Sequence, residues 1–281
     1  MTTLRDAIDS AAAVFADAGI DSARYDAEAL AAHLAGTDRG RLALLDPPDD
    51  DFFGRYRDLV AARSARVPLQ HLIGTAPFGP VTVEVGPGVF TPRPETEAML
   101  EWALKQQVPP SPLIVDACTG SGALAIALAH SLPEARVLAL ENSESALDYA
   151  RRNCAGTSVE LIDADVTVPG LLSQFDGGVD LLVSNPPYIP DGTVLDPEVA
   201  QHDPAQALFG GQDGMSVIVP LAALAARLLR AGGLVAIEHD DSTSAATVDA
   251  LLDTGCFQDV VARTDLAGRP RFVTAVRNGQ P

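Results

Sequence analysis

Predicted strands and helices alternate from residue 113 to the end of the chain, and this alternation restricts the fold more than any other feature. Short apolar runs end in small or polar residues, and a segment with helical spacing of apolar residues follows each of them. The alternation predicts an α/β fold with a mostly parallel sheet covered by helices on both faces. Strands are predicted at 113–116, 136–141, 159–163, 179–184 and 234–238, and helices at 123–131, 143–155, 215–231 and 243–254. An antiparallel pair, 260–264 and 271–277, is expected to close the sheet.

The first 75 residues instead have the pattern of short helices, predicted to begin after Thr3 and at about residues 22, 38 and 49. The pattern leaves open whether this bundle recognises a partner or only packs. An alternating run at 81–85, followed by a short run at 89–91, predicts a hairpin-like connector. We therefore expect a helical domain over 1–75, a β-hairpin linker over 76–95 and a larger α/β domain over 96–281.

Charge and composition exclude several classes of function. The formal net charge is −19 and no run of Lys or Arg occurs, so nucleic acid is a poor candidate for the substrate, whereas a basic protein partner is easier to accommodate. Three cysteines without a CxxC pair and five scattered histidines predict free thiols and no metal site. Acidic residues interrupt the N-terminus and no apolar run reaches 18 residues, so we expect a cytoplasmic protein without a membrane segment.

A glycine-rich turn follows the strand at 113–116 and opens a helix. Cys118, Thr119, Gly120, Ser121 and Gly122 form it, and small residues there let a ligand approach the backbone. The turn lacks the full dinucleotide pattern, and a tight packing turn is the alternative interpretation. Glu141 ends the next strand, where a carboxylate can bind the two hydroxyls of a ribose. A nucleoside without pyrophosphate, such as S-adenosylmethionine, is therefore the favoured ligand.

The sequence Asn185-Pro186-Pro187-Tyr188 is the most specific signal in the chain. It follows an apolar strand, and the two prolines end that strand because neither can donate to a ladder. An amide side chain, backbone carbonyls and a flat ring make an acceptor-rich pocket suited to a planar –NH2 group. Ligands of open α/β sheets bind beyond the carboxyl ends of the strands, where this loop and the glycine-rich turn both lie.

Several further segments carry a resemblance to a known family: 68–74 with Phe78, 91–97, 207–215 and Glu238-His239. Together with the Asn-Pro-Pro-Tyr loop, they make nearly the whole chain resemble the PrmC/HemK family of protein-glutamine N5-methyltransferases. Three departures are visible, and the first two concern the donor site: Cys118 stands where the family usually has glycine, and Val166 follows the acidic residue where an aromatic residue is frequent. An arginine that is common after the loop is also absent, with Ala200 near its place.

The resemblance implies a class I S-adenosylmethionine-dependent methyltransferase with a Rossmann-like, seven-stranded sheet. It implies that residues 118–122 and Glu141 bind the methyl donor, that Asp165 and Val166 border its adenine, and that Asn185 also contacts it. The implied substrate is the glutamine of the Gly-Gly-Gln loop in class I peptide-chain release factors. Asn185, Pro186, Pro187, Tyr188 and Arg93 are the predicted substrate-binding residues, and we expect a monomer. The triplet Gly210-Gly211-Gln212 spells the substrate motif, which we interpret as a coincidence.

The predicted catalytic residues are Asn185, Pro186 and Tyr188. The Asn185 side-chain oxygen and the Pro186 carbonyl would each accept one amide hydrogen, and Tyr188 would pack against the amide plane. Two other interpretations stay open. The same loop serves methyltransferases that act on exocyclic amino groups of nucleobases or on the glutamine of a ribosomal protein. A non-catalytic module that binds release factors is the second, and Cys118 is its only support.

Overall fold

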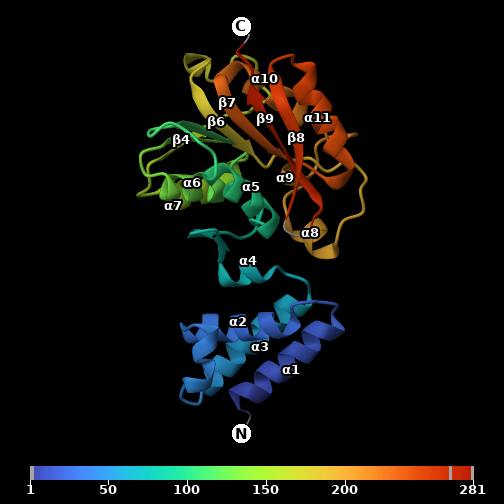
Figure 1. The fold of residues 1–281 in the computed structure, drawn as a ribbon. Helices are drawn as coiled ribbons and strands as arrows, with labels where there is room; N and C mark the ends of the chain where they lie inside the picture. Colours follow the sequence, from blue (N-terminus) through green and yellow to red (C-terminus); the bar gives the residue numbers. More distant parts are fainter. Residues whose placement is uncertain (1–2, 266–267, 280–281) are drawn as a thin grey trace. The chain divides into compact units, whose positions relative to one another are not determined.

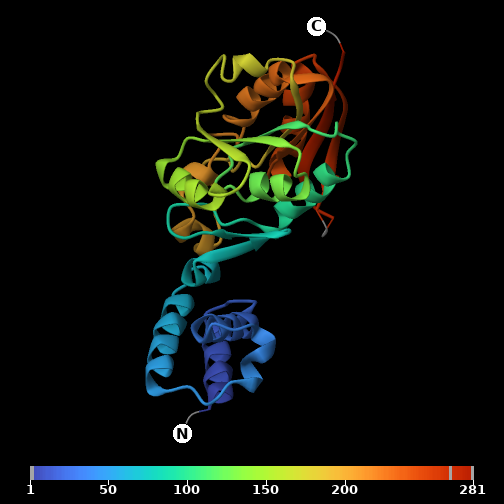
Figure 2. The same ribbon diagram turned by 90° about the vertical axis from the view of Figure 1, so that its left-hand side faces the viewer.

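The computed structural model describes residues 3–265 and 268–279, and the chain forms two compact units (Figures 1 and 2). One unit comprises Met1–Thr75 together with Leu195–His202, and the other comprises Ala76–Val194 together with Asp203–Pro281. We call them the helical unit and the sheet unit. The chain therefore returns once from the sheet unit to the helical unit, at Leu195, shortly after the Asn-Pro-Pro-Tyr loop.

The helical unit is built from short amphipathic helices around one apolar cluster that includes Phe15, Leu30 and Tyr56. Its first helix is capped as the sequence predicts, since the Thr3 side chain and Asp6 form a capping box. The predicted helix at 38–45 is a 3-10 helix instead, because the segment before Pro47-Pro48 is too short for a stable α-helix. The elements are α1 (Leu4–Asp17), α2 (Ala23–Ala35), η1 (Arg39–Leu44), α3 (Asp50–Ser64), α4 (Leu69–Ile73) and α8 (Pro197–His202).

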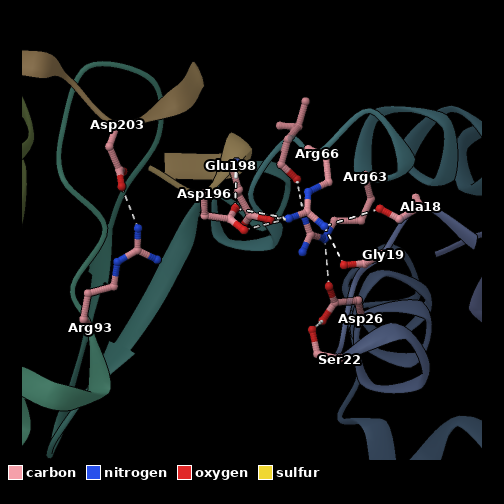
Figure 3. Close-up of polar contacts among 11 residues, drawn as sticks. Ala18, Gly19, Ser22, Asp26, Arg63, Arg66, Arg93, Asp196, Glu198 and Asp203 are labelled. Atoms are coloured by element: carbon pink, nitrogen blue, oxygen red, sulfur yellow. Dashed lines mark hydrogen bonds and ion pairs between the residues drawn. The ribbon is translucent and has the colours of Figure 1, made fainter. Parts of the chain in front are cut away.

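Ion pairs, of which those of Arg63 are buried and that of Arg66 is exposed, hold the segment 195–202 in the helical unit (Figure 3). Arg63 donates from Nε to Asp26 and from Nη1 to Glu198, each at 2.7 Å. The Arg63 and Asp26 side chains are almost fully buried. Beside them, Arg66 donates to both carboxylate oxygens of Asp196 at 3.1 Å. Because charges in such surroundings are costly when unpaired, this network fixes α8 to the helical unit.

The hairpin lies one strand earlier than the sequence predicts. Its strands are β1 (Thr75–Phe78) and β2 (Val81–Glu84), joined by Gly79-Pro80. The expected second strand at 89–91 is wrong, since these residues have no strand conformation. Val89 instead closes a turn by donating to the Gly86 carbonyl. The hairpin buries Phe78 and Val83 against the sheet unit's apolar cluster.

A seven-stranded sheet of order β5-β4-β3-β6-β7-β9-β8 forms the centre of the sheet unit. The first five of these strands are parallel, whereas β9 pairs antiparallel with both β7 and β8. This confirms the predicted α/β class and its closing antiparallel pair. The strands are β3 (Leu113–Ala117), β4 (Arg136–Glu141), β5 (Val159–Asp163), β6 (Val179–Ser184), β7 (Leu229–Glu238), β8 (Phe257–Thr264) and β9 (Pro270–Arg277).

Helices cover both faces of this sheet, and the layers can be followed in Figures 1 and 2. One apolar cluster joins one face of the strands to α5 (Pro94–Leu104), α6 (Ala123–Ser131) and α7 (Glu144–Cys154). The other cluster joins the opposite face to α10 (Ile218–Leu228) and α11 (Ser244–Asp253). Short helices at α9 (Ala205–Leu208), η2 (Ser173–Phe175) and η3 (Asp241–Thr243) complete the unit.

The long helix, predicted at 215–231, is shorter than the sequence predicts and spans Ile218–Leu228. It stops at Leu228, and Gly232 and Gly233 lie inside β7 rather than after the helix. A Cβ at Gly233 would lie 3.0 Å from the Val179 carbonyl oxygen, so the glycine permits close approach of β6. The pairing of β7 with β6, whose register shifts beside Val179, therefore places these two glycines in a strand instead of after a helix. No helix among the described residues is long and apolar enough to cross a membrane.

Candidate active site

The glycine-rich turn and the Asn-Pro-Pro-Tyr loop lie side by side because β3 and β6 are neighbours. Ala117 is paired with Ser184, and the Ser184 hydroxyl donates to the Ala117 carbonyl at 2.7 Å. The next residues are Cys118 on one strand and Asn185 on the other. The parallel register therefore brings the two predicted motifs to one edge of the sheet.

The buried Asp116 side chain holds the glycine-rich turn in place by hydrogen bonds. Its carboxylate accepts from the Thr119 hydroxyl at 2.5 Å and from the Ala125 amide at 3.0 Å, and it is 1% exposed. Burial raises the pKa of Asp116 to about 7, and the two hydrogen bonds oppose that shift. These contacts fix the turn to the first turn of α6.

Glu141, the last residue of β4, is hydrogen-bonded to the glycine-rich turn. One carboxylate oxygen accepts from the Gly120 amide at 2.8 Å, and the other accepts from the amides of Asn142 and Ser143 at 3.0 and 2.9 Å. Gly120 has a φ of 59°, and a Cβ placed there would meet nothing within 4 Å. A carboxylate has further lone pairs for ribose hydroxyls, and the open side of Gly120 leaves room above the backbone. These residues fit S-adenosylmethionine.

Cys118 has left-handed backbone, with a φ of 60°. This conformation favours glycine, which explains why glycine suits the position. The Cys118 side chain packs against the apolar cluster on the α10 face of the sheet, and burial raises the pKa of its thiol. The cysteine is therefore a strained packing residue.

Asp165 and Val166 follow β5 at the same edge of the sheet. The Asp165 carboxylate accepts from the Thr167 hydroxyl and amide, at 2.7 and 2.8 Å, and these hydrogen bonds lower its pKa. Val166 is buried in the apolar cluster. Asp165 is thus held ionised at this edge, while Val166 contributes to the core beneath it.

Two polar side chains of the Asn-Pro-Pro-Tyr loop are held by a buried carboxylate. Asn185 donates from Nδ2 to the Thr96 hydroxyl at 3.2 Å, and Thr96 donates to Glu238 at 2.8 Å. The Tyr188 hydroxyl donates to the other oxygen of Glu238 at 3.1 Å. Sequence reasoning placed Thr96 and Glu238 in segments of family resemblance but did not identify them as partners of Asn185. They lie 142 residues apart, so no local pattern connects them.

The segment 208–214 contacts the backbone of the same loop. Ile189 donates to the Leu208 carbonyl at 2.8 Å and accepts from the Gly210 amide at 2.9 Å. Gly214 has a φ of 77° and packs against the backbone of Tyr188. Gly210 and its neighbours therefore have a structural role in supporting the loop, consistent with the coincidental reading of Gly210-Gly211-Gln212.

Arg93 is engaged by its own chain (Figure 3). Its guanidinium donates to the buried Asp203 at 2.6 Å and lies over the Phe90 ring. Its predicted contact with substrate remains a prediction. Among the described residues, no group of His, Cys, Asp and Glu side chains could hold a metal ion.

The fold and this edge of the sheet define a class I S-adenosylmethionine-dependent methyltransferase. A methyltransferase from Pyrococcus furiosus has a similar fold, with a TM-score of 0.54, 20% identity and coverage of 78% of this chain and 99% of that one. Residues 6–74 match the PrmC N-terminal domain, and residues 81–208 match the methyltransferase small domain.

Curated relatives match nearly the full length of the chain, among them the following two. A release factor glutamine methyltransferase of Mycobacterium tuberculosis is 68% identical over 99% of this chain and 92% of its own. A 4-amino-L-phenylalanine/4-methylamino-L-phenylalanine methyltransferase of Streptomyces pristinaespiralis is 39% identical over 98% of this chain and 96% of its own. The chain belongs to the release factor glutamine methyltransferase family.

Proposed function

We propose that the protein transfers a methyl group from S-adenosylmethionine to the side-chain amide nitrogen of the glutamine in the Gly-Gly-Gln loop of class I peptide-chain release factors. The observation that carries the proposal is the pairing of Ala117 with Ser184, which brings the glycine-rich turn beside an acceptor-rich loop. The 68% identity to a release factor glutamine methyltransferase supports this substrate over the aromatic amine of the 39% identical relative.

The methyl donor would be held by residues 118–122, with Glu141 on its ribose hydroxyls and Asp165 and Val166 beside its adenine. When bound, S-adenosylmethionine supplies a methyl group that is attached to a positively charged sulfur. The sulfur is the leaving group and becomes a neutral thioether. Asp116 and Glu141 hold the glycine-rich turn in place, and Asn185, which follows the neighbouring strand β6, would also contact the methyl donor.

The substrate amide would lie in the Asn-Pro-Pro-Tyr loop. An amide nitrogen is a poor nucleophile because its lone pair is delocalised into the carbonyl. Asn185 Oδ1 and the Pro186 carbonyl would each accept one N–H, which orients the nitrogen so that its lone pair points at the methyl group. The same acceptors stabilise the positive charge that develops on the nitrogen during attack. No strong base is needed first, because the methylated nitrogen becomes acidic and releases its proton afterwards.

The remaining roles are proposed on the same basis. Pro187 and Tyr188 would line the amide pocket, and Arg93 would contact the partner from the segment before α5. The helical unit would recognise the release factor, and the protein would act as a cytoplasmic monomer. The net charge of −19 supports a protein substrate, because it repels nucleic acid.

The test is mass spectrometry of a release factor after incubation with the protein and S-adenosylmethionine. We expect the Gly-Gly-Gln peptide to gain the mass of one CH2 group, and a release factor with that glutamine replaced by alanine to gain nothing. Calorimetry with the methyl donor is run in parallel. Donor binding without any gain of mass on the peptide would contradict the proposal, and absent donor binding would favour a non-catalytic binding module.

A further inference from the structure

Glu238 and Thr96 connect the two polar side chains of the Asn-Pro-Pro-Tyr loop to the body of the sheet unit. Glu238 ends β7 and is 2% exposed, and Thr96 lies in the first turn of α5 and is 5% exposed. Glu238 accepts from Thr96 with one carboxylate oxygen and from Tyr188 with the other. Thr96 in turn accepts from Asn185. Four groups from three parts of the chain therefore form one buried hydrogen-bonded network.

Counting hydrogens fixes the direction of every bond in this network. An ionised carboxylate only accepts, so the single hydroxyl hydrogen of Thr96 must point to Glu238. Thr96 can then only accept from Asn185, which must turn its NH2 group toward it. The Asn185 oxygen is therefore directed away from Thr96. Within the described part of the chain, no group donates a hydrogen bond to this oxygen.

We propose that Glu238 and Thr96 are positioning residues that set which way round the Asn185 amide is held, so that its oxygen, and not its NH2 group, meets the substrate. The inference rests on the proposed function, because only a substrate that presents N–H groups needs this orientation. Rotation of the Asn185 side chain by half a turn would present a donor to another donor.

Tyr188 is controlled by the same carboxylate. Its one hydroxyl hydrogen is given to Glu238, so the Tyr188 oxygen has no hydrogen to offer elsewhere. Glu238 thereby directs the Tyr188 hydroxyl and, through Thr96, one N–H of the Asn185 amide away from the substrate. The Asn185 oxygen and the Pro186 carbonyl remain as acceptors, which matches a substrate with two N–H groups on one nitrogen.

The groups around Glu238 oppose one another. Burial, with the charge of Glu95, raises the pKa of Glu238 to about 7, whereas the bonds from Thr96 and Tyr188 and the positive charge of Arg271 oppose this shift. Arg271 itself lies near the carboxylates of Asp241 and Asp265. A protonated Glu238 would donate to Thr96 and free the Thr96 hydroxyl to donate to Asn185, which would reverse the amide. Ionisation of Glu238 is thus required for the proposed orientation.

The decisive variant is Thr96→Val, which keeps the shape of the side chain and removes the hydroxyl. We expect kcat to fall about 10- to 100-fold with unchanged affinity for the methyl donor, because orientation of Asn185 is lost while the donor site is intact. Thr96→Ser keeps the hydroxyl and is expected to restore most of the activity. Thr247→Val is the matched control, since Thr247 is a buried threonine whose hydroxyl bonds a helix carbonyl in α11. A normal kcat for Thr96→Val would overturn the inference.

Glu238→Gln is the second variant, which keeps the inference testable if Thr96→Val does not fold. A carboxylate accepts from both Thr96 and Tyr188, but an amide has one oxygen and must donate to one of them. We therefore expect a lower kcat with normal binding of the methyl donor. A wild-type kcat in Glu238→Gln would overturn the inference.

Neutron diffraction of the wild-type protein tests the orientation without any assay of activity. In the expected map, the deuterium of the Thr96 hydroxyl points at Glu238, and the deuterated side-chain amide group of Asn185 points at Thr96. The reverse orientation would overturn the inference even in an enzyme that methylates release factors. The expected orientation in a protein that fails to methylate them would instead identify the proposed substrate as the error.

Discussion

The backbone of Gly214 packs so closely on Tyr188 that a Cβ atom on the glycine would overlap the Tyr188 carbonyl oxygen. Gly214 also has a φ of 77°, which other residues adopt at a cost. The segment 207–215, which resembles part of the family signature, therefore supports the backbone of the Asn-Pro-Pro-Tyr loop. The precision of this loop depends on a residue that is not itself expected to touch substrate.

We expect Gly214→Ala to lower kcat on the order of 100-fold, because the added methyl group displaces the Tyr188 backbone and misplaces the amide pocket. Gly156→Ala is the matched control. Gly156 has a similar φ of 78°, but its Cβ would meet nothing within 4 Å. Both variants should lose stability by about 1–2 kcal/mol from the left-handed backbone, and Gly214→Ala should lose more because of the overlap with Tyr188. Only Gly214→Ala should lose activity. Steady-state kinetics measures the loss of activity, and urea unfolding measures the loss of stability. Equal activity in both variants would contradict the role of Gly214 in supporting the loop.

Asn185→Ala is expected to abolish methyl transfer while binding of the methyl donor largely survives. The substitution removes one of two acceptors for the substrate amide, whereas the contacts of Glu141 and Asp116 with the glycine-rich turn remain. Single-turnover methylation and calorimetry provide the two readouts. Near-normal turnover in this variant would remove the proposed role of Asn185.

Cys118→Gly is expected to change the free energy of unfolding by less than about 1 kcal/mol. Relief of the left-handed backbone and loss of the buried thiol are each on the order of 1 kcal/mol, and they have opposite signs. Affinity for the methyl donor should persist, because the Cys118 side chain packs on the apolar cluster. Cys118→Val tests the backbone contribution and should destabilise the protein. A large loss of donor affinity in Cys118→Gly would show instead that the thiol contacts the ligand.

Glu238→Gln is expected to stabilise the protein above pH 7 even as it lowers activity. The pKa of Glu238 is raised from 4.5 to about 7, chiefly by burial. Between these pH values the folded chain keeps a proton that the unfolded chain has released, so the free energy of unfolding falls as pH rises through this window. Glutamine does not titrate, so the variant should gain up to about 3 kcal/mol near pH 8 and nothing near pH 4.

Urea unfolding of both proteins across this pH range measures that difference, and a pH-independent difference would contradict the assignment to Glu238. The catalytic counterpart is a wild-type kcat that falls as pH drops through about 7, since protonation reverses the Asn185 amide. This decline should be absent in Glu238→Gln.

Arg63→Met is expected to destabilise the helical unit by about 3–5 kcal/mol, because it leaves the buried Asp26 carboxylate without its positively charged partner. Arg151→Met is the control, since Arg151 pairs with Asp148 on an exposed face of α7 and its loss should change little. Hydrogen exchange of α2 and α3 localises the effect to the helical unit. Equal stability of the two variants would show that the buried pair contributes no more than an exposed one.

The sequence predicts those features that depend on local pattern and on register. Alternation of strands and helices identifies the sheet, and the position of Cys118 and Asn185 after neighbouring strands brings the two motifs together. Features that depend on contacts between distant segments were missed. Thr96 and Glu238 meet across 142 residues, and Arg63 and Glu198 across 135. Likewise, Gly233 resembles a helix stop in isolation, and only the approach of Val179 explains its place inside a strand.

The return of residues 195–202 to the helical unit has a consequence for dissecting the protein. A cut at residue 75 does not separate the two units, because a truncated chain that starts at Ala76 still carries Asp196 and Glu198 without their arginines. The isolated first 75 residues would conversely leave Arg63 without Glu198 and Arg66 without Asp196. We therefore expect each fragment to be less stable than the same residues in the whole chain, and a fragment of the amino-terminal helices should include residues 195–202.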